Sequence, residues 1–257
     1  MEHAPPADQR LVDEAVDIAR EAGKLTLRWF RSSTLAVDTK GDGTPVTEAD
    51  RAAERYIRER IDAYAPDSTL VGEEEGSSSG SGPLTWHIDP IDGTKGFARG
   101  VPLYSTLLAV SDEHGPAVGV IVIPATEEVV WAGRGLGART DEGPARVSTT
   151  SALEGAYVST SSVSRWGTDV FSRAMHAGVE VRGWGDGYGF LMTVTGRIDG
   201  MVDLGAGKPW DYAPMPILLR EAGGRFSDLD GEERIESPSV LATNGAIHDA
   251  LLRVVNG

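Results

Sequence analysis

The sequence contains no cysteine among its 257 residues. This absence excludes disulfide bonds, thiolate zinc sites and thiol nucleophiles, so any metal would have to be held by oxygen or imidazole ligands. The five histidines form no H-E-x-x-H motif, which argues against zinc. The metal chemistry that remains is mainly that of oxygen ligands.

Positively charged residues are also scarce. Lys and Arg number 24 against 39 Asp and Glu, and the formal net charge is −15. Nucleic-acid binding needs clusters of basic side chains, and none is evident, so we expect no nucleic-acid partner. A field of this sign would instead favour a cationic substrate.

Long apolar runs are missing as well. No run approaches the roughly 18 apolar residues that a membrane span requires. The first residues, with Glu2, His3, Pro5 and Asp8, lack the basic and apolar regions of a signal peptide. We therefore expect no membrane partner and a cytoplasmic location.

The length of the chain and its 40% of hydrophobic residues are sufficient for a compact globular protein with a sizeable core. Apolar residues recur every three or four positions over 8–30 and again from 46 onward, which predicts two helices. Five runs predict strands, the last three of them as an antiparallel meander. These runs are 68–71, 84–88, 104–111, 117–123 and 128–132.

The second half of the sequence alternates between predicted strands, at 156–159, 179–182 and 198–204, and predicted helices, at 169–177 and 188–195. Such alternation is typical of an α/β layer. A polar stretch around 141–151 separates this layer from the meander. We therefore predict an N-terminal α+β subdomain over 1–145 and a C-terminal α/β subdomain over 146–257.

The stretch 86–97, W-H-I-D-P-I-D-G-T-K-G-F, brackets a proline with two aspartates and continues into a Gly-Thr turn. We expect a strand over 84–88 and an end to regular pairing at Pro90, because proline has no N–H group for pairing. Asp89 and Asp92 would then lie at the strand exit, where Gly93 lets backbone N–H groups approach a ligand. Carboxylate oxygens suit Mg²⁺, and N–H groups suit a phosphate. The alternative is an ordinary turn that Asp89 caps and Asp92 closes.

Three further acidic motifs each have a structural explanation. The T-x-x-D motif at 47–50 matches a helix capping box, which would account for Asp50. The G-E-E motif at 72–74 follows a predicted strand and could be a solvated turn. The W-D motif at 210–211 lies where a helix is predicted over 213–221, and an acidic residue at a helix N-terminus is ordinary.

The segment 182–188, R-G-W-G-D-G-Y, lies between a predicted strand and a predicted helix. Asp186 could cap that helix or project into a cleft. Taken in chain order, T-E-A-D, G-E-E, D-P-I-D-G-T, G-D and W-D resemble the motifs of the inositol monophosphatase superfamily. D-G-T-K followed by Phe97, and R-x-W-G-D-x-Y-G, resemble its histidinol-phosphatase branch.

This resemblance covers nearly the whole chain. It implies a layered αβαβα sandwich, a fold with both α+β and α/β character, and a homodimer. It also implies an Mg²⁺-dependent phosphomonoesterase with two or three ions per site. On this basis the subdomain 1–145 carries the metal-binding signature, and 146–257 completes the active site.

The resemblance also implies a role for individual residues. Six residues would bind metal: Glu73, Asp89, Ile91, Asp92, Asp211 and Asp50. Glu73, Asp89 and the Ile91 carbonyl would hold one ion, while Asp89, Asp92 and Asp211 would hold a second. A third ion would lie between Glu73 and Asp50.

Catalysis would depend on Glu73, Thr94 and Asp50, with Thr94 hydrogen-bonded to the attacking water and one of the two acids taking its proton. The residues that would contact the substrate are Asp92, Gly93, Thr94, Arg182, Asp186 and Asp211. Asp203 is not assigned to the site, because the spacing from it to Trp210 is one residue longer than the family pattern.

For the substrate we favour L-histidinol phosphate, an intermediate of histidine biosynthesis whose amine and imidazole could pair with Asp186. An inositol, cyclitol or sugar phosphatase is the alternative enzyme, since a neutral polyol needs hydrogen-bond partners rather than counter-charges. A non-catalytic divalent-cation-binding protein is an alternative from another class. The presence of Thr94 and Asp50 argues against it, because structural ion binding needs neither a positioned hydroxyl nor a water-activating acid.

Overall fold

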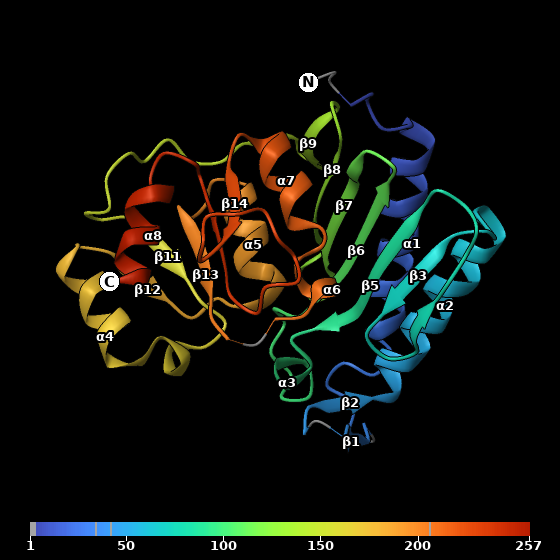
Figure 1. Ribbon diagram of the computed structural model, residues 1–257. Helices are drawn as coiled ribbons and strands as arrows, with labels where there is room; N and C mark the ends of the chain where they lie inside the picture. The colour runs from blue at the N-terminus through green and yellow to red at the C-terminus, as the bar shows by residue number, and fades with distance from the viewer. Residues whose placement is uncertain (1–3, 34, 42, 206) are drawn as a thin grey trace.

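The computed structural model describes residues 4–33, 35–41, 43–205 and 207–257 (Figure 1). The described chain forms an eight-stranded sheet, a five-stranded sheet and a small two-stranded sheet, with helices between and outside the two larger sheets. Within these ranges no helix has the length and apolar character needed to cross a membrane.

The eight-stranded sheet has the order β10-β9-β8-β7-β6-β5-β3-β4. Strands β5 to β10 pair with their neighbours in antiparallel fashion, which confirms the predicted meander, and β3 pairs with β5 in parallel. The strands are β3 (Thr69–Gly72), β4 (Gly76–Ser78), β5 (Thr85–Asp92), β6 (Ser105–Asp112), β7 (Gly115–Ile123), β8 (Glu128–Gly133), β9 (Gly137–Thr140) and β10 (Gly143–Pro144).

Helices α1 (Gln9–Thr26) and α2 (Glu48–Tyr64) cover one face of this sheet (Figure 1). Their inward faces carry the apolar residues that the periodicity predicts. Ile18, Ile57 and Ile61 are fully buried in one cluster with Trp86 of β5. Each such buried side chain contributes roughly 1.5–3 kcal/mol, so this layer is a rigid support for the end of β5.

Regular pairing of β5 is interrupted at Pro90, as predicted, but the strand extends beyond its predicted end at Ile88. The strand continues to Asp92, while its pairing with β6 is irregular between Asp89 and Asp92. Proline cannot donate to the ladder, so it occurs inside a sheet only where pairing is interrupted. Regular pairing resumes with Asp92 opposite Ser105.

Helices α5 (Asp186–Val194) and α7 (Met215–Ala222) lie between the two sheets, in a cluster with Leu107 and Ile121 of the first sheet and Phe226 of the second. The second sheet has the order β12-β11-β13-β15-β14 and mixes parallel with antiparallel pairs. Its strands are β11 (Tyr157–Ser159), β12 (Glu180–Arg182), β13 (Gly200–Asp203), β14 (Arg225–Asp228) and β15 (Val240–Thr243).

Helices α4 (Val163–His176) and α8 (His248–Asn256) pack on the outer face of the second sheet, where Trp166 and Leu251 are buried against Val158 and Val202. The order of layers is therefore helix, sheet, helix, sheet, helix, which confirms the predicted αβαβα sandwich. The proposed subdomain boundary between 145 and 146 lies between β10 and β11, and it stays a prediction.

The short elements lie near the end of β5. They are β1 (Val37–Thr39), β2 (Pro45–Thr47), α3 (Thr94–Phe97), the 3₁₀ helix Pro124–Thr126 and α6 (Pro209–Tyr212). The helix predicted over 213–221 is preceded by α6, so Asp211 lies inside a short helix rather than just before one.

Candidate active site

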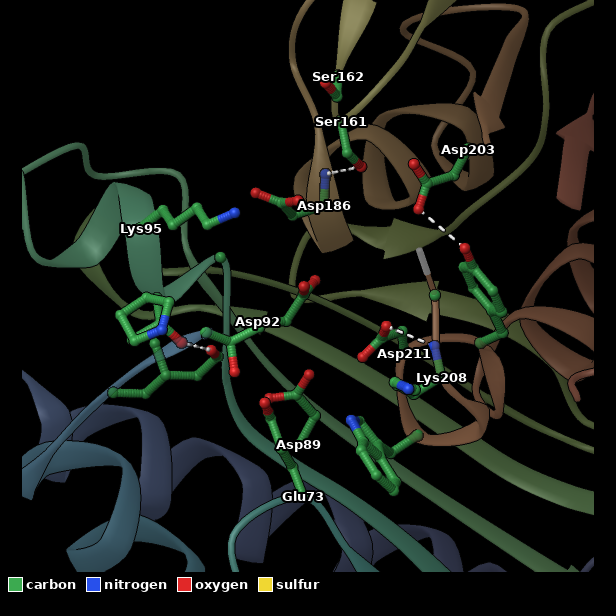
Figure 2. A pocket seen from close by; sticks show the side chains of 18 of the residues that line it. Glu73, Asp89, Asp92, Lys95, Ser161, Ser162, Asp186, Asp203, Lys208 and Asp211 are labelled. Atoms are coloured by element: carbon green, nitrogen blue, oxygen red, sulfur yellow. Dashed lines mark hydrogen bonds between the residues drawn. The ribbon is translucent and has the colours of Figure 1, made fainter. Parts of the chain in front are cut away.

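A cavity of about 530 Å³ opens beyond the end of β5. Its walls come from the Lys40 loop, α3, the start of α5, the end of β13 and α6. Figure 2 shows the acidic side chains of this cavity directed toward a common space. The sequence-predicted residues that line it are Glu73, Asp89, Ile91, Asp92, Gly93, Thr94, Asp186 and Asp211.

Three carboxylates form the centre of the site. One carboxylate oxygen from each of Asp89, Asp92 and Asp211 lies within 4.8 Å of the other two. Asp89 is 1% exposed, and its Oδ1 has no hydrogen-bond partner in the described part of the chain. An unpaired buried carboxylate oxygen is costly unless a cation compensates it. An all-oxygen set of this kind fits Mg²⁺.

The same cluster raises the pKa values of its members. Burial, followed by repulsion from Glu73, raises the pKa of Asp89 well above its usual range. Burial and the negative charge of Asp186 likewise raise the pKa of Asp92 well above its usual range. Burial raises the pKa of Asp211 to about 7, with a contribution from Glu73. Such carboxylates bind either protons or cations.

Glu73 follows the end of β3 and lies beside Asp89 (Figure 2). Its backbone N–H donates to the Ile88 carbonyl at 3.2 Å, which ties the turn to β5. The Nζ atom of Lys40 is 2.7 Å from a carboxylate oxygen of both Glu73 and Glu74. Burial lowers the Lys40 pKa, but the hydrogen bonds to the two glutamates outweigh it and raise the pKa overall. The ammonium therefore stays charged beside the site.

Asp50 is fully buried on α2, where it caps the helix and also contacts Thr94. Its Oδ2 accepts from the Thr47 N–H at 2.8 Å and from the Thr47 hydroxyl at 2.5 Å, which confirms the capping box. Its Oδ1 faces the Thr94 hydroxyl at 3.2 Å. The same hydroxyl is 3.0 Å from the Ile91 carbonyl, so its single proton serves one acceptor at a time. Burial raises the pKa of Asp50 despite these bonds.

Gly93 precedes α3 with φ of 87°, a left-handed conformation that favours glycine. A Cβ atom at this position would lie 2.9 Å from Asp186 Oδ2. Glycine therefore allows the Gly-Thr turn to approach Asp186 closely. The predicted phosphate-binding turn and the predicted substrate-binding acid are neighbours in space.

Asp186 is the first residue of α5, and Gly185 is the N-cap, so the alternative in which Asp186 caps this helix is wrong. Asp186 has φ of 56°, which is unusual for a residue with a side chain, and its N–H donates to Ser161 Oγ at 2.9 Å. Burial and the charge of Asp203 raise its pKa to about 6. The next residue, Gly187, donates its N–H to Asp92 Oδ2 at 2.5 Å.

Asp203 also lines the cavity, although the sequence spacing gave no support for this. It is the last residue of β13, and its Oδ2 accepts from the Tyr212 hydroxyl at 2.9 Å. Figure 2 shows Asp203 on the same side of the cavity as Asp186 and Ser161. Burial raises the pKa of Asp203 as well. Two acids therefore lie on this side of the cavity, with Lys95 close enough to act on Asp186 and Arg165 on Asp203.

Arg182 does not line the cavity, and we no longer include it in the substrate site. It ends β12, the edge strand of the second sheet. Its guanidinium pairs with Glu180 at 3.1 Å and lies 5.1 Å from the centre of the Tyr157 ring. The contacts of Arg182 are therefore made on its own sheet, and it is not among the residues that line the cavity.

Sequence reasoning missed several lining residues: Lys95, Ser161, Ser162, Arg165 and Lys208. One available signal was position, because Ser161 and Ser162 follow β11 in the same way that Asp186 follows β12. Ligands of α/β layers bind beyond the carboxyl ends of strands.

Comparison with known proteins agrees with this geometry. Residues 8–256 match the model of the inositol monophosphatase family. A histidinol-phosphatase of Mycobacterium tuberculosis is 38% identical over 251 residues, which cover 94% of this chain and 96% of that protein. One of Streptomyces coelicolor is 37% identical over 262 residues, which cover 97% of each.

Among solved structures, an IMPase of Thermotoga maritima has a TM-score of 0.87 at 33% identity and covers 97% of both chains. The predicted resemblance to the histidinol-phosphatase branch is thereby confirmed as a resemblance. With the family model, the relatives and the acidic cavity in agreement, the chain belongs to the inositol monophosphatase family and is a phosphoric monoester hydrolase.

Proposed function

We propose that this protein is an Mg²⁺-dependent phosphatase that hydrolyses L-histidinol phosphate to L-histidinol and phosphate in histidine biosynthesis. The observation that carries the proposal is the composition of the cavity. A compact carboxylate cluster lies beside a Gly-Thr turn, and two further acids, Asp186 and Asp203, lie next to both. Such a site matches a substrate with an anionic end and a cationic end.

Glu73, Asp89 and the Ile91 carbonyl would hold one ion, and Asp89, Asp92 and Asp211 a second. A third would lie between Glu73 and Asp50. The clustered oxygens of Asp89, Asp92 and Asp211 and the unpaired Asp89 Oδ1 support this assignment. Bound Mg²⁺ would supply a more acidic water and charge stabilisation for the leaving oxygen.

The protein's own residues would handle the proton. Thr94 Oγ is placed to accept a hydrogen bond from the water while it donates its own proton toward Asp50 Oδ1, 3.2 Å away. The raised pKa of Asp50 suits an acceptor of that proton. Glu73 is the second candidate base, since it lines the same cavity. No covalent phosphoenzyme is needed for such a displacement.

The N–H groups of Gly93 and Thr94 would bind the phosphate oxygens, since the first N–H groups of a helix have no partner within it. Asp92 and Asp211 would contact the ester from the other side. The cationic end would then face Asp186 and Asp203, where charge-assisted hydrogen bonds to the amine and imidazole are available. A neutral polyol would gain less from two counter-charges. The names of the two relatives at 37–38% identity support the same choice.

Phosphate release tests this proposal directly. L-histidinol phosphate and inositol 1-phosphate are assayed side by side with Mg²⁺, and EDTA is added in a parallel series. We expect much faster release from histidinol phosphate and no release in EDTA. Preference for inositol phosphate would identify a cyclitol phosphatase. Mg²⁺ binding without release from either ester would identify a non-catalytic cation-binding protein.

We also propose a homodimer, on the basis of the family, and a cytoplasmic location, for which the absence of cysteine is favourable. Neither nucleic acid nor membrane is proposed as a partner, since the net charge is −15. Light scattering on the purified protein would measure the mass in solution. The division into 1–145 and 146–257 can be tested by expressing each half separately.

A further inference from the structure

Glu54 is a buried acid that the proposed catalysis does not use. It lies on α2, one turn after Asp50, and its exposed fraction is 0%. A carboxylate in such a place is strongly destabilising unless charged or hydrogen-bonding partners satisfy it. The identity of those partners therefore indicates what the residue is for.

The partners of Glu54 belong to the turn that carries Glu73. Its Oε2 accepts from the Glu74 N–H at 2.7 Å, and its Oε1 accepts from the Glu75 N–H at 3.1 Å. Arg58, one turn further along α2, donates from Nε to Oε1 at 2.9 Å. Two backbone amides and one guanidinium thus satisfy the charge, and two of these three donors come from the turn itself.

The residue before the turn, Gly72, leaves room for Glu54 and Arg58 to reach it. A Cβ atom on Gly72 would lie 2.0 Å from Glu54 Oε1 and 2.6 Å from Arg58 Nη2, so only glycine lets the two side chains reach the turn. Arg58 also donates to the Gly76 carbonyl at the start of β4. Glu54 and Arg58 therefore contact both strand ends that flank the turn, as well as its interior.

We propose that Glu54, held by Arg58, is a positioning residue for Glu73 and thereby sets the Mg²⁺ affinity of the site between Glu73 and Asp89. This inference rests on the proposed function. The Glu73 N–H is bonded to the Ile88 carbonyl, and Glu54 fixes the next two peptides, so the direction of the Glu73 side chain is determined from both sides. Without that restraint, repulsion from Asp89 would favour outward orientations of Glu73.

The same helix then serves the site twice. Asp50, the proposed proton acceptor, faces Thr94. One helical turn later, Glu54 fixes the turn that carries Glu73, a proposed metal ligand. A merely structural ion pair is the competing explanation. It would affect unfolding but leave metal affinity unchanged, and this difference can be measured without any turnover assay.

The test is Glu54→Gln with Mg²⁺ alone as the probe, in isothermal titration calorimetry of the full chain. Glutamine keeps one acceptor oxygen and presents an NH₂ group to the other amide. We expect the Kd for Mg²⁺ to rise about tenfold, the lower end of the effect of losing a residue that orients a metal ligand. Thermal unfolding should show a correspondingly smaller gain on Mg²⁺ addition.

Glu14→Gln is the matched control. It removes the negative charge of an ion pair to Arg60 of α2, 2.6 Å in length, and Arg60 donates to Glu14 and Tyr56 rather than to the Glu73 turn. It should leave the Mg²⁺ Kd at the wild-type value. If Glu54→Gln does not fold, Arg58→Met carries the test, and we expect a rise in Kd in the same direction.

An unchanged Mg²⁺ Kd in the folded variant, with only a lower unfolding temperature, would overturn the inference and leave the proposed function intact. Absence of Mg²⁺ binding in the wild type would instead defeat the proposed function and this inference with it.

Discussion

Two buried aspartates, Asp89 and Asp228, lie on strands of the two sheets and have opposite surroundings. Asp228 is 2% exposed, and its Oδ1 accepts from the N–H groups of Asp230 and Glu232. Its Oδ2 pairs with Arg234 at 2.5 Å. These bonds outweigh burial and lower its pKa. Asp89 is as buried, but other acids surround it, and its pKa is raised.

The difference separates a structural acid from a functional one. The loop after β14 supplies the compensating groups for Asp228 from within the chain. Around Asp89 the described chain leaves Oδ1 unpaired and adds two further carboxylates within 4.8 Å. Compensation at Asp89 must therefore come from something that is bound.

The largest effect is expected for Asp89→Asn. The substitution removes a carboxylate that belongs to both proposed Mg²⁺ sites, so turnover of histidinol phosphate should fall below detection. The fold should be no less stable in EDTA, because the raised pKa of Asp89 favours the protonated carboxyl when no cation is bound, and an amide has nearly the same shape. Phosphate release and thermal unfolding measure the two halves of this prediction. Near-normal activity would eliminate the two-ion scheme.

Asp186→Ala should reduce kcat/KM for histidinol phosphate by about 100-fold, since a charge-assisted hydrogen bond contributes roughly 1.5–3 kcal/mol. The loss on inositol 1-phosphate should be several-fold smaller, because no cationic group depends on this carboxylate. The steady-state rates of both substrates are measured on the same preparation. Equal losses on the two esters would remove Asp186 from substrate selection.

The sequence was sufficient for many of the helices and strands and for the carboxylates of the site, while the order of the layers was predicted from the resemblance to the family. Strand and helix periods identify which faces are buried, and D-P-x-D-G-T places two acids and a glycine within a few residues of each other. Residues that are neighbours within a short motif stay neighbours in the folded protein. The interruption of pairing at Pro90 was predicted, but the continuation of β5 from Ile88 to Asp92 was not, because an interrupted ladder and a strand end produce the same local signal.

The errors at the site concern strand ends. Arg182 was placed in the pocket by its neighbours in sequence, but it lies within β12 and bonds to its own sheet. Asp203 was left out on a spacing argument, yet its position is fixed by the end of β13, not by the distance to Trp210. Ser161 became visible only when packing brought its loop to the cavity. Which side chain faces a cavity depends on the exact residue where a strand stops.

The pH dependence of stability should differ between the two states of the site. In EDTA, acids whose folded pKa is raised, such as Asp211 at about 7, keep their protons when the unfolded chain loses them near pH 4. Their contribution to stability is therefore present below pH 4 and is lost as pH rises to about 7. With Mg²⁺ the ionised forms are bound, so the gain in unfolding temperature on adding Mg²⁺ should grow from pH 5 to pH 8.

Subtracting the unfolding temperature in EDTA from that in Mg²⁺ removes the contributions to stability that are the same in both conditions. His248, whose pKa is lowered to about 4 by burial, adds stability as pH rises from about 4 to 6.5 in either condition. Asp228 contributes at every pH above its ordinary pKa and loses that contribution only as pH falls through its lowered value. A Mg²⁺ gain that stays constant from pH 5 to pH 8 would contradict proton release at the cluster.

The smallest effect is expected for Asp228→Asn, the counterpart of Asp89→Asn. The variant should lose about 1–2 kcal/mol of unfolding free energy, since two backbone N–H groups and Arg234 lose a charged acceptor. Its kcat should stay within about twofold of wild type, because the residue does not line the cavity. Urea denaturation measures the first quantity, with Asp230→Asn as control. Asp230 has a 78% exposed side chain and pairs only at the surface with Arg234, so its loss should cost under about 0.5 kcal/mol. A variant of Asp228 that is fully stable but inactive would reverse the assignment of structural and functional acids.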